Sequence, residues 1–160
     1  MTNIRELKAE DVSAVADFYQ HYNLDYLKDS TPPLLYELFE EKEAKTIFQK
    51  YLSEIKELSH YKVMIAEKNK QIVGLIIGNI MIDKNLKLGK IGVLEDWGVA
   101  QSEAHQGIGT QLYQALEIWF KGAGCQQIHS TTWISNRASR DAHLKMGFIE
   151  SAICFRKKIL

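Results

Sequence analysis

The chain has 160 residues, 46% of them hydrophobic, which suits one domain with its own core and leaves no room for a second, so we expect a single domain over 1–160. Twenty basic and twenty acidic side chains give zero formal charge, which argues against nucleic-acid binding because that normally needs a basic excess. The sequence has neither the pattern of a signal peptide nor an apolar run of roughly 18 residues, so we predict a cytoplasmic protein with no membrane partner.

The first half of the chain begins with a strand and continues as helices. Residues 4–8 are typical of a short strand, and Asp11 is a suitable cap for the helix that follows. Apolar residues recur there at helical spacing: Val12, Val15, Ala16 and Tyr19. Two more helices are predicted, one around 34–39 and one over 46–58.

The middle of the chain changes to the composition of strands. Residues 62–68 and 71–82 are rich in Val and Ile, and Asn69-Lys70 between them predicts a hairpin turn. A second turn is predicted near 83–85, with a return strand over 90–100. The elements expected after that are a helix over 111–120, a strand over 127–132, a helix over 139–145 and a last strand over 149–157.

This order of elements predicts a mixed α/β (α+β) fold. The three consecutive hairpin strands favour a central, mostly antiparallel twisted sheet, which we expect to have six to seven strands. Helices before and after these strands would flank the sheet.

A glycine-bearing loop joins the strand over 90–100 to the next helix. It runs from Ala104 to Thr110 and contains Gly107 and Gly109. Free backbone N–H groups and the helix dipole favour a bound phosphate at such a place. Leu112 stands where the dinucleotide fingerprint needs a third glycine, and the Lys-Ser or Lys-Thr pair of a P-loop is absent. Alone, the pattern also fits a plain tight turn.

The loop is more informative together with a later segment. That segment carries Asn136, Ser139, His143, Lys145 and Gly147-Phe148. From about residue 90 to 148 the sequence resembles the GCN5-related N-acetyltransferase (GNAT) family, and residues 4–17 resemble the family's usual start more weakly. The resemblance implies the acyl-CoA N-acyltransferase fold, acetyl-CoA (coenzyme A) as co-substrate without a metal, and transfer of the acetyl group to a primary amine.

The resemblance also implies which residues contact the coenzyme. The loop amides would hold the pyrophosphate, and the preceding strand would pair with the pantetheine arm. The expected binding residues are Trp97, Gly98, Val99, His105, Gln106, Gly107, Ile108, Gly109, Thr110, Asn136 and Ser139. Two positions depart from the family. Ala104 replaces the usual Arg or Gln, and His143 replaces the tyrosine thought to protonate the departing thiolate.

Acetyl transfer needs a neutral amine, so a base must remove a proton from the alkylammonium ion. Strand alternation predicts that Glu95 and Asp96 face opposite sides of the sheet. Leu94-Glu95-Asp96 resembles the run in diamine and polyamine acetyltransferases, so we predict Glu95 as the base; a solvated carboxylate is the alternative. His143 is predicted as the acid, able to donate from either protonation state. Its alternative is a helix-face histidine.

The acceptor and partners are less defined by the sequence. Residues 21–43 combine aromatic and acidic side chains that suit a cationic amine: Tyr22, Tyr26, Tyr36, Phe39, Asp25, Asp29, Glu37, Glu40 and Glu41. A small polyamine-like, diamine-like or amino-acid-like amine is the first expectation. A protein N-terminus or lysine, an aminoglycoside-type amine, and a catalytically silent acetyl-CoA sensor remain open. We also expect a homodimer, formed through the last strand.

Metal and disulfide sites are not indicated by the cysteines and histidines. Cys125 and Cys154 form no CxxC pair, and no histidine lies near them at zinc spacing. We therefore predict two reduced thiols and no metal.

Overall fold

The computed structural model describes residues 1–30, 44–82 and 89–155, apart from the side chains of 23–30 and 44. Five strands form one sheet in the order β1-β2-β3-β4-β5, and all neighbours are antiparallel except β4 and β5, which are parallel. The strands are β1 (Asn3–Glu6), β2 (Tyr61–Lys68), β3 (Gln71–Ile82), β4 (Lys90–Val99) and β5 (Gln127–Ser130). The helices are α1 (Val12–Ser30), α3 (Ala44–Ile55), α4 (Ile108–Gly122) and α5 (Arg137–Lys145), with short 3-10 turns η1 (Ala9–Asp11) and η3 (Gln101–Glu103).

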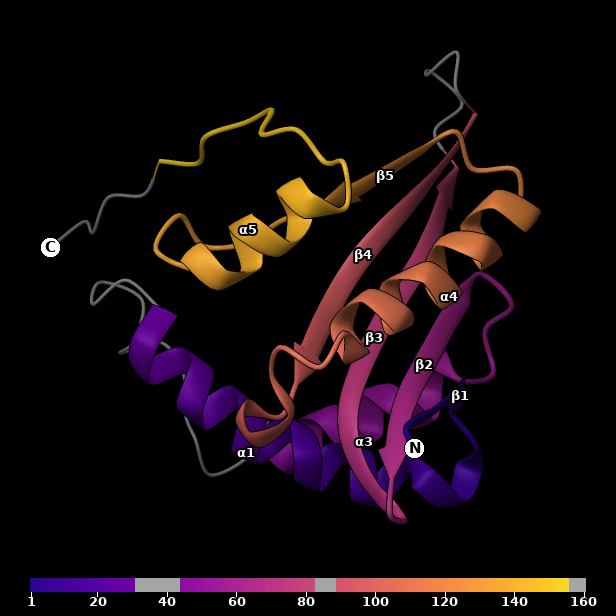
Figure 1. The fold of residues 1–160 in the computed structure, drawn as a ribbon. Helices are drawn as coiled ribbons and strands as arrows, with labels where there is room; N and C mark the ends of the chain where they lie inside the picture. Colours follow the sequence, from indigo (N-terminus) through magenta and orange to yellow (C-terminus); the bar gives the residue numbers. More distant parts are fainter. Residues whose placement is uncertain (31–43, 83–88, 156–160) are drawn as a thin grey trace, which may run out of the picture.

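The helices cover both faces of the sheet, with α1 and α3 on one face and α4 on the other (Figure 1). β3 shows how the strands divide their side chains. Leu75 and Ile77 join the core under α1 and α3, whereas Ile76 between them joins the core under α4. A strand covered on both faces has a continuous apolar run, which explains the buried stretch in the middle of β3.

The face of the sheet under α4 accommodates one large aromatic ring. Phe120 is almost fully buried there, opposite Gly78 of β3 and Gly92 of β4. A Cβ at Gly78 or Gly92 would come within 2.6 or 2.7 Å of an atom of the Phe120 ring. These two glycines therefore set how closely the C-terminal half of α4 approaches the sheet.

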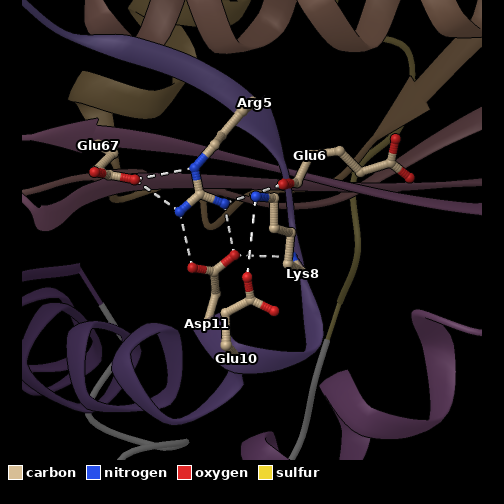
Figure 2. Close-up of polar contacts among 6 residues, drawn as sticks. All are labelled: Arg5, Glu6, Lys8, Glu10, Asp11 and Glu67. Atoms are coloured by element: carbon tan, nitrogen blue, oxygen red, sulfur yellow. Dashed lines mark hydrogen bonds and ion pairs between the residues drawn. The ribbon is translucent and has the colours of Figure 1, made fainter.

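An ion cluster fixes the N-terminal strand to the start of α1 (Figure 2). The Arg5 guanidinium donates to both carboxylate oxygens of Asp11 at 2.6 and 2.8 Å, and to Glu67 of β2 at 2.7 and 3.0 Å. Asp11 also accepts from the backbone N–H of Lys8 at 2.8 Å. The hydrogen bonds from Arg5 lower the pKa of Asp11 below its ordinary value, outweighing the opposite effect of burial.

Most of the predicted elements are confirmed, including the mixed sheet flanked by helices. The first helix is longer than its apolar pattern indicated and continues to Ser30. The strand count is lower than expected, five within the described ranges rather than six to seven. The predicted helix around 34–39 and the turn near 83–85 lie outside the described residues.

The predicted strand over 149–157 is wrong for the part that the structure describes, 149–155. This segment forms no ladder with the described strands, and Ile149, Ile153 and Phe155 are 84%, 73% and 89% exposed. Alternating apolar residues suit a strand, but a strand also needs a partner for its backbone N–H and C=O groups. Among the described residues, no helix is long and apolar enough to span a bilayer.

Candidate active site

The loop between β4 and α4 presents backbone donors. Its turn requires two left-handed residues, His105 with φ 63° and Gly107 with φ 78°. Gly107 is the N-cap of α4, and no side chain caps the helix there. The first N–H groups of a helix have no partner within the helix, and here the dipole adds partial positive charge. Residues 107–110 therefore form a site that suits an anionic group.

β4 and β5 are paired only at one end. Their register runs from Ile91 opposite Gln127 to Leu94 opposite Ser130, where β5 ends. β4 continues to Val99, so residues 95–99 have no described strand beside them on that edge. A strand edge of this kind can accept main-chain-like hydrogen bonds from an extended ligand.

A bulge in β4 determines where its acidic residues point. Leu94 lies opposite Gly78 and Asp96 lies opposite Ile77, so Glu95 is an extra residue between them. The prediction that Glu95 and Asp96 face opposite sides of the sheet is wrong, because the extra residue interrupts the alternation. Glu95 contacts Tyr51 of α3, and Asp96 lies beside α1, so both carboxylates face the same helical layer.

Glu95 is held by three donors. Tyr51 and Asn79 donate hydrogen bonds to its two carboxylate oxygens, and the Tyr61 hydroxyl lies 3.4 Å from Oε1. Burial and Glu95 itself raise the pKa of Tyr51, which keeps that hydroxyl protonated and able to donate. Both carboxylate oxygens of Glu95 are therefore occupied by contacts within the protein.

Asp96 lies in a small aromatic pocket. Phe18, Tyr19 and Tyr22 of α1 line it together with Leu75 and Gly98. The Tyr22 ring packs where a Cβ of Gly98 would be, 2.6 Å from the nearest ring atom, and this glycine lets the ring close over β4. Burial first, and the charge of Glu95 second, raise the pKa of Asp96 to about 6.

His143 lies on the other side of the sheet, where both ring nitrogens are engaged. Nδ1 is 2.7 Å from the carbonyl oxygen of Ser139, and Nε2 is 2.8 Å from the Ser130 hydroxyl. The ring packs edge-on against Trp97 and Phe148, at centroid distances of 5.4 and 5.0 Å. The Ser139 hydroxyl oxygen lies 3.3 Å from the same nitrogen. Because a carbonyl only accepts, the shorter contact favours the tautomer with the proton on Nδ1. In this tautomer the neutral ring accepts at Nε2, and the role of His143 as the acid stays a prediction.

Two residues predicted at the coenzyme have structural contacts of their own. Asn136 is buried and caps α5, accepting from the Ser139 backbone N–H at 3.0 Å and donating to Thr132 at 3.3 Å. The Ser139 carbonyl fixes His143. Trp97 donates from Nε1 to the Gly109 carbonyl at 3.1 Å, which joins β4 to the first turn of α4.

Several residues of this region had no individual signal in the sequence. Tyr51, Tyr61 and Asn79 surround Glu95 from three separate elements, and Ser130 meets His143 from β5. Of the aromatic and acidic side chains noted in 21–43, only Tyr22 is described, and it lines the Asp96 pocket. No group of three metal-ligating side chains is found in the described ranges.

Comparison with known proteins gives one family. The model of the acetyltransferase (GNAT) family matches residues 15–148. An aminoglycoside N(6')-acetyltransferase type 1 of Klebsiella aerogenes is 44% identical over 73 residues, 44% of this chain and 48% of that protein. A protein of the same name from Stenotrophomonas maltophilia is 31% identical over 61 residues, 38% of this chain and 40% of that protein. The matches thus span half or less of these curated relatives.

Solved structures share the fold over almost the whole chain. The aminoglycoside N-acetyltransferase AAC(6')-Iy in complex with CoA has a TM-score of 0.76 at 20% identity, covering 99% of this chain and 96% of that one. The same enzyme with the bisubstrate analogue CoA-S-monomethyl-acetylneamine has a TM-score of 0.71 at 21% identity, with 99% of each chain covered. A transcriptional regulator from Bacillus halodurans has a TM-score of 0.76 at 18% identity, covering 99% and 100%. At these identities the similarity establishes the fold.

Proposed function

Because the chain belongs to the acetyltransferase (GNAT) family, we propose that it is an acetyl-CoA-dependent N-acetyltransferase, folded as one catalytic domain, that acts on a cationic amine. The observation that carries the proposal is the placement of the β4 bulge. It puts two carboxylates on one face of β4, next to an edge that no described strand covers and to the start of α4, which has no side-chain cap. Each of these features supplies one requirement of acetyl transfer.

The coenzyme would bind along the free edge of β4 and end at α4. The first amides of α4, from Gly107 to Thr110, would hold the pyrophosphate, and the edge over 95–99 would pair with the amides of the pantetheine arm. His105 and Gln106 complete the loop. Ala104 contributes no side-chain contact, so the affinity would depend mainly on the backbone. Bound acetyl-CoA supplies a thioester carbonyl that is open to attack by an amine.

The carboxylate pair would receive the amine and take its proton. Glu95 is the predicted base, but both of its carboxylate oxygens are already engaged by donors of the protein itself. Asp96 has a raised pKa because it is buried and because it lies beside the charge of Glu95. We therefore assign proton removal to Asp96 and binding of the cationic acceptor to Glu95. The rings of Phe18 and Tyr22 would add cation–π attraction.

Two further groups would act on the thioester. A backbone N–H on the free edge near Val99 would stabilise the oxyanion that forms at the carbonyl. His143, at the position of the usual tyrosine, would supply the proton for the departing thiolate. Its ring packs against Trp97, so it lies beside the free edge of β4.

For the acceptor, an aminoglycoside-type primary amine is favoured over the polyamine suggested by Leu94-Glu95-Asp96. The named curated relatives are aminoglycoside acetyltransferases, and the polyamine motif has no support beyond those three residues. Paired carboxylates and aromatic rings suit a ligand with several ammonium groups. A homodimer remains a proposal, tested by the mass of the particle in solution.

The test is calorimetric titration with acetyl-CoA, followed by a thiol-release screen. The amines compared would be an aminoglycoside with a 6'-amine, one with a 6'-hydroxyl, spermidine and a lysine peptide. We expect micromolar acetyl-CoA binding that Gly107→Pro abolishes, and thiol release only with the 6'-amine. Binding without thiol release for any amine would favour a silent sensor, and no binding would refute the enzyme.

A further inference from the structure

Each ring nitrogen of His143 has its own partner. Among the described residues, Ser130 is the hydrogen-bond partner of Nε2. The Ser139 carbonyl fixes the proton on Nδ1, at 2.7 Å. The lone pair of Nε2 then accepts from the Ser130 hydroxyl at 2.8 Å. The edge contacts of Trp97 and Phe148 fix the plane of the ring. A proton leaving Nε2 therefore reaches Ser130 first.

Ser130 lies where the two parallel strands separate. It is the last residue of β5 and the partner of Leu94, directly before the bulge at Glu95. Leu94 packs in the core under α4, and neighbours in a parallel ladder share a face, which puts Ser130 on the α4 side as well. The separation of the strands beyond this pair is where the thioester end of an arm bound along β4 would lie.

We propose that Ser130 is a further catalytic residue, whose hydroxyl protonates the departing thiolate, and that His143 acts through it. The proposal rests on the proposed acetyl transfer. Neutral His143 draws the Ser130 proton toward Nε2, away from the coenzyme. When His143 is charged, Nε2–H donates to the Ser130 oxygen, and the Ser130 proton turns toward the gap between the strands. Protonation of the His143 imidazole thus orients the Ser130 O–H toward the gap between the strands.

The proton transfers balance. The cationic amine first gives one proton to Asp96, which releases it to solvent. The neutral nitrogen then attacks the thioester carbon and gives its second proton to Asp96, and the C–S bond breaks with its electron pair on sulfur. The Ser130 hydroxyl gives its proton to that sulfur, while Nε2–H of the His143 imidazolium replaces it. His143 is left neutral with its proton on Nδ1. Solvent then restores the imidazolium and removes the proton from Asp96.

The first experiment observes the imidazole directly, in the protein without coenzyme. Nitrogen NMR of the ¹⁵N-histidine-labelled chain distinguishes protonated from bare ring nitrogens, and His143→Gln assigns the signals. We expect neutral His143 to be protonated at Nδ1, and Ser130→Ala to move the Nε2 signal but not the Nδ1 signal. Thr131→Ala, which removes the exposed hydroxyl of the next residue, should move neither. A proton on Nε2 of the neutral ring would overturn the proposal.

The second experiment measures turnover by thiol release with an accepted amine. Ser130→Ala should lower turnover about 100-fold, a typical contribution of general acid catalysis, with the calorimetric affinity for acetyl-CoA unchanged. Ser130→Thr, which keeps the hydroxyl, should restore most of the rate. His143→Gln should lower turnover by a similar factor. The double variant of Ser130→Ala and His143→Gln should be no slower than the slower single variant, because both residues act in one step. Thr131→Ala should retain wild-type turnover.

The outcomes separate the two proposals. Wild-type turnover in Ser130→Ala, or losses that multiply in the double variant, would refute the role of Ser130 and leave the acetyltransferase intact. No thiol release by the wild-type protein with any amine would refute the acetyltransferase, and the catalytic role of Ser130 with it.

Discussion

Asp96→Asn is expected to stabilise the protein while it disables the reaction. Burial beside the rings of α1, and then the charge of Glu95, raise the pKa of Asp96 from 3.8 to about 6. A folded-state pKa above the unfolded value means that the fold favours the protonated acid. The contribution of this group is therefore most favourable below the unfolded pKa and is lost as the pH rises through the folded one. At neutral pH the folded protein carries the full cost of ionisation.

The size of this cost follows from the difference between the two pKa values. At about 1.4 kcal/mol for each pKa unit, a difference of about two units corresponds to about 3 kcal/mol well above pH 6. About half of this loss in the free energy of unfolding should occur as the pH rises from roughly 5 to 8. The carboxamide is still a polar group in the pocket, so we expect a net gain of about 2 kcal/mol in the free energy of unfolding at pH 8.

Urea unfolding of both proteins at about pH 5 and pH 8 measures the difference. Asp141→Asn is the matched control, since Asp141 is exposed on α5, and we expect its effect to stay within about 0.5 kcal/mol at both pH values. In thiol-release assays Asp96→Asn should lose turnover but keep its affinity for acetyl-CoA. The reasoning fails if the stability difference between wild type and Asp96→Asn is the same at both pH values.

Three other predictions concern the glycines and the ion cluster. Gly107→Ala places a side chain at φ 78°, which should lower the free energy of unfolding by about 1–2 kcal/mol and weaken acetyl-CoA binding in calorimetry. The control Gly122→Ala lies in open space at the end of α4 and should raise the free energy of unfolding by about 0.5–1 kcal/mol. Asp11→Asn should destabilise by about 1–3 kcal/mol at neutral pH. Because Arg5 lowers the pKa of Asp11, the stabilisation by the ionised carboxylate is lost as the pH falls. The urea unfolding curves of wild type and Asp11→Asn should therefore converge in acid and separate as the pH is raised toward neutral. Gly92→Ala should destabilise by about 1–3 kcal/mol through contact with the Phe120 ring, seen as a lower urea midpoint; an unchanged midpoint would contradict the packing.

The order of elements could be predicted because it depends on local patterns. Helical spacing identified α1 and α4, and the pair Asn69-Lys70 identified a hairpin in which both residues have positive φ. The last predicted strand shows the limit of this reasoning. Residues 149–155 have the alternation of a strand, but alternation says nothing about whether a neighbouring strand is available.

The loop at the start of α4 was found for a similar reason. Gly107 is needed at a left-handed position, and that requirement is visible in the sequence as a glycine before a helix. The partners of Glu95 were not visible, since Tyr51, Asn79 and Glu95 come from three elements that meet only in the folded chain. The tautomer of His143 likewise depends on the Ser139 carbonyl, a backbone atom that every residue has.

The bulge at Glu95 connects the stability of the protein with its chemistry. Leu94 and Trp97 pack toward α4, and the two acidic residues between them both face α1 and α3. With strict alternation one carboxylate would point into the α4 side, beside the ring that joins Gly109 to β4. One extra residue thus keeps negative charge away from the expected pyrophosphate site and concentrates it where a cationic amine would bind. The repulsion between the two carboxylates, which helps raise the pKa of Asp96, is the cost of that separation, and a bound ammonium group would relieve it.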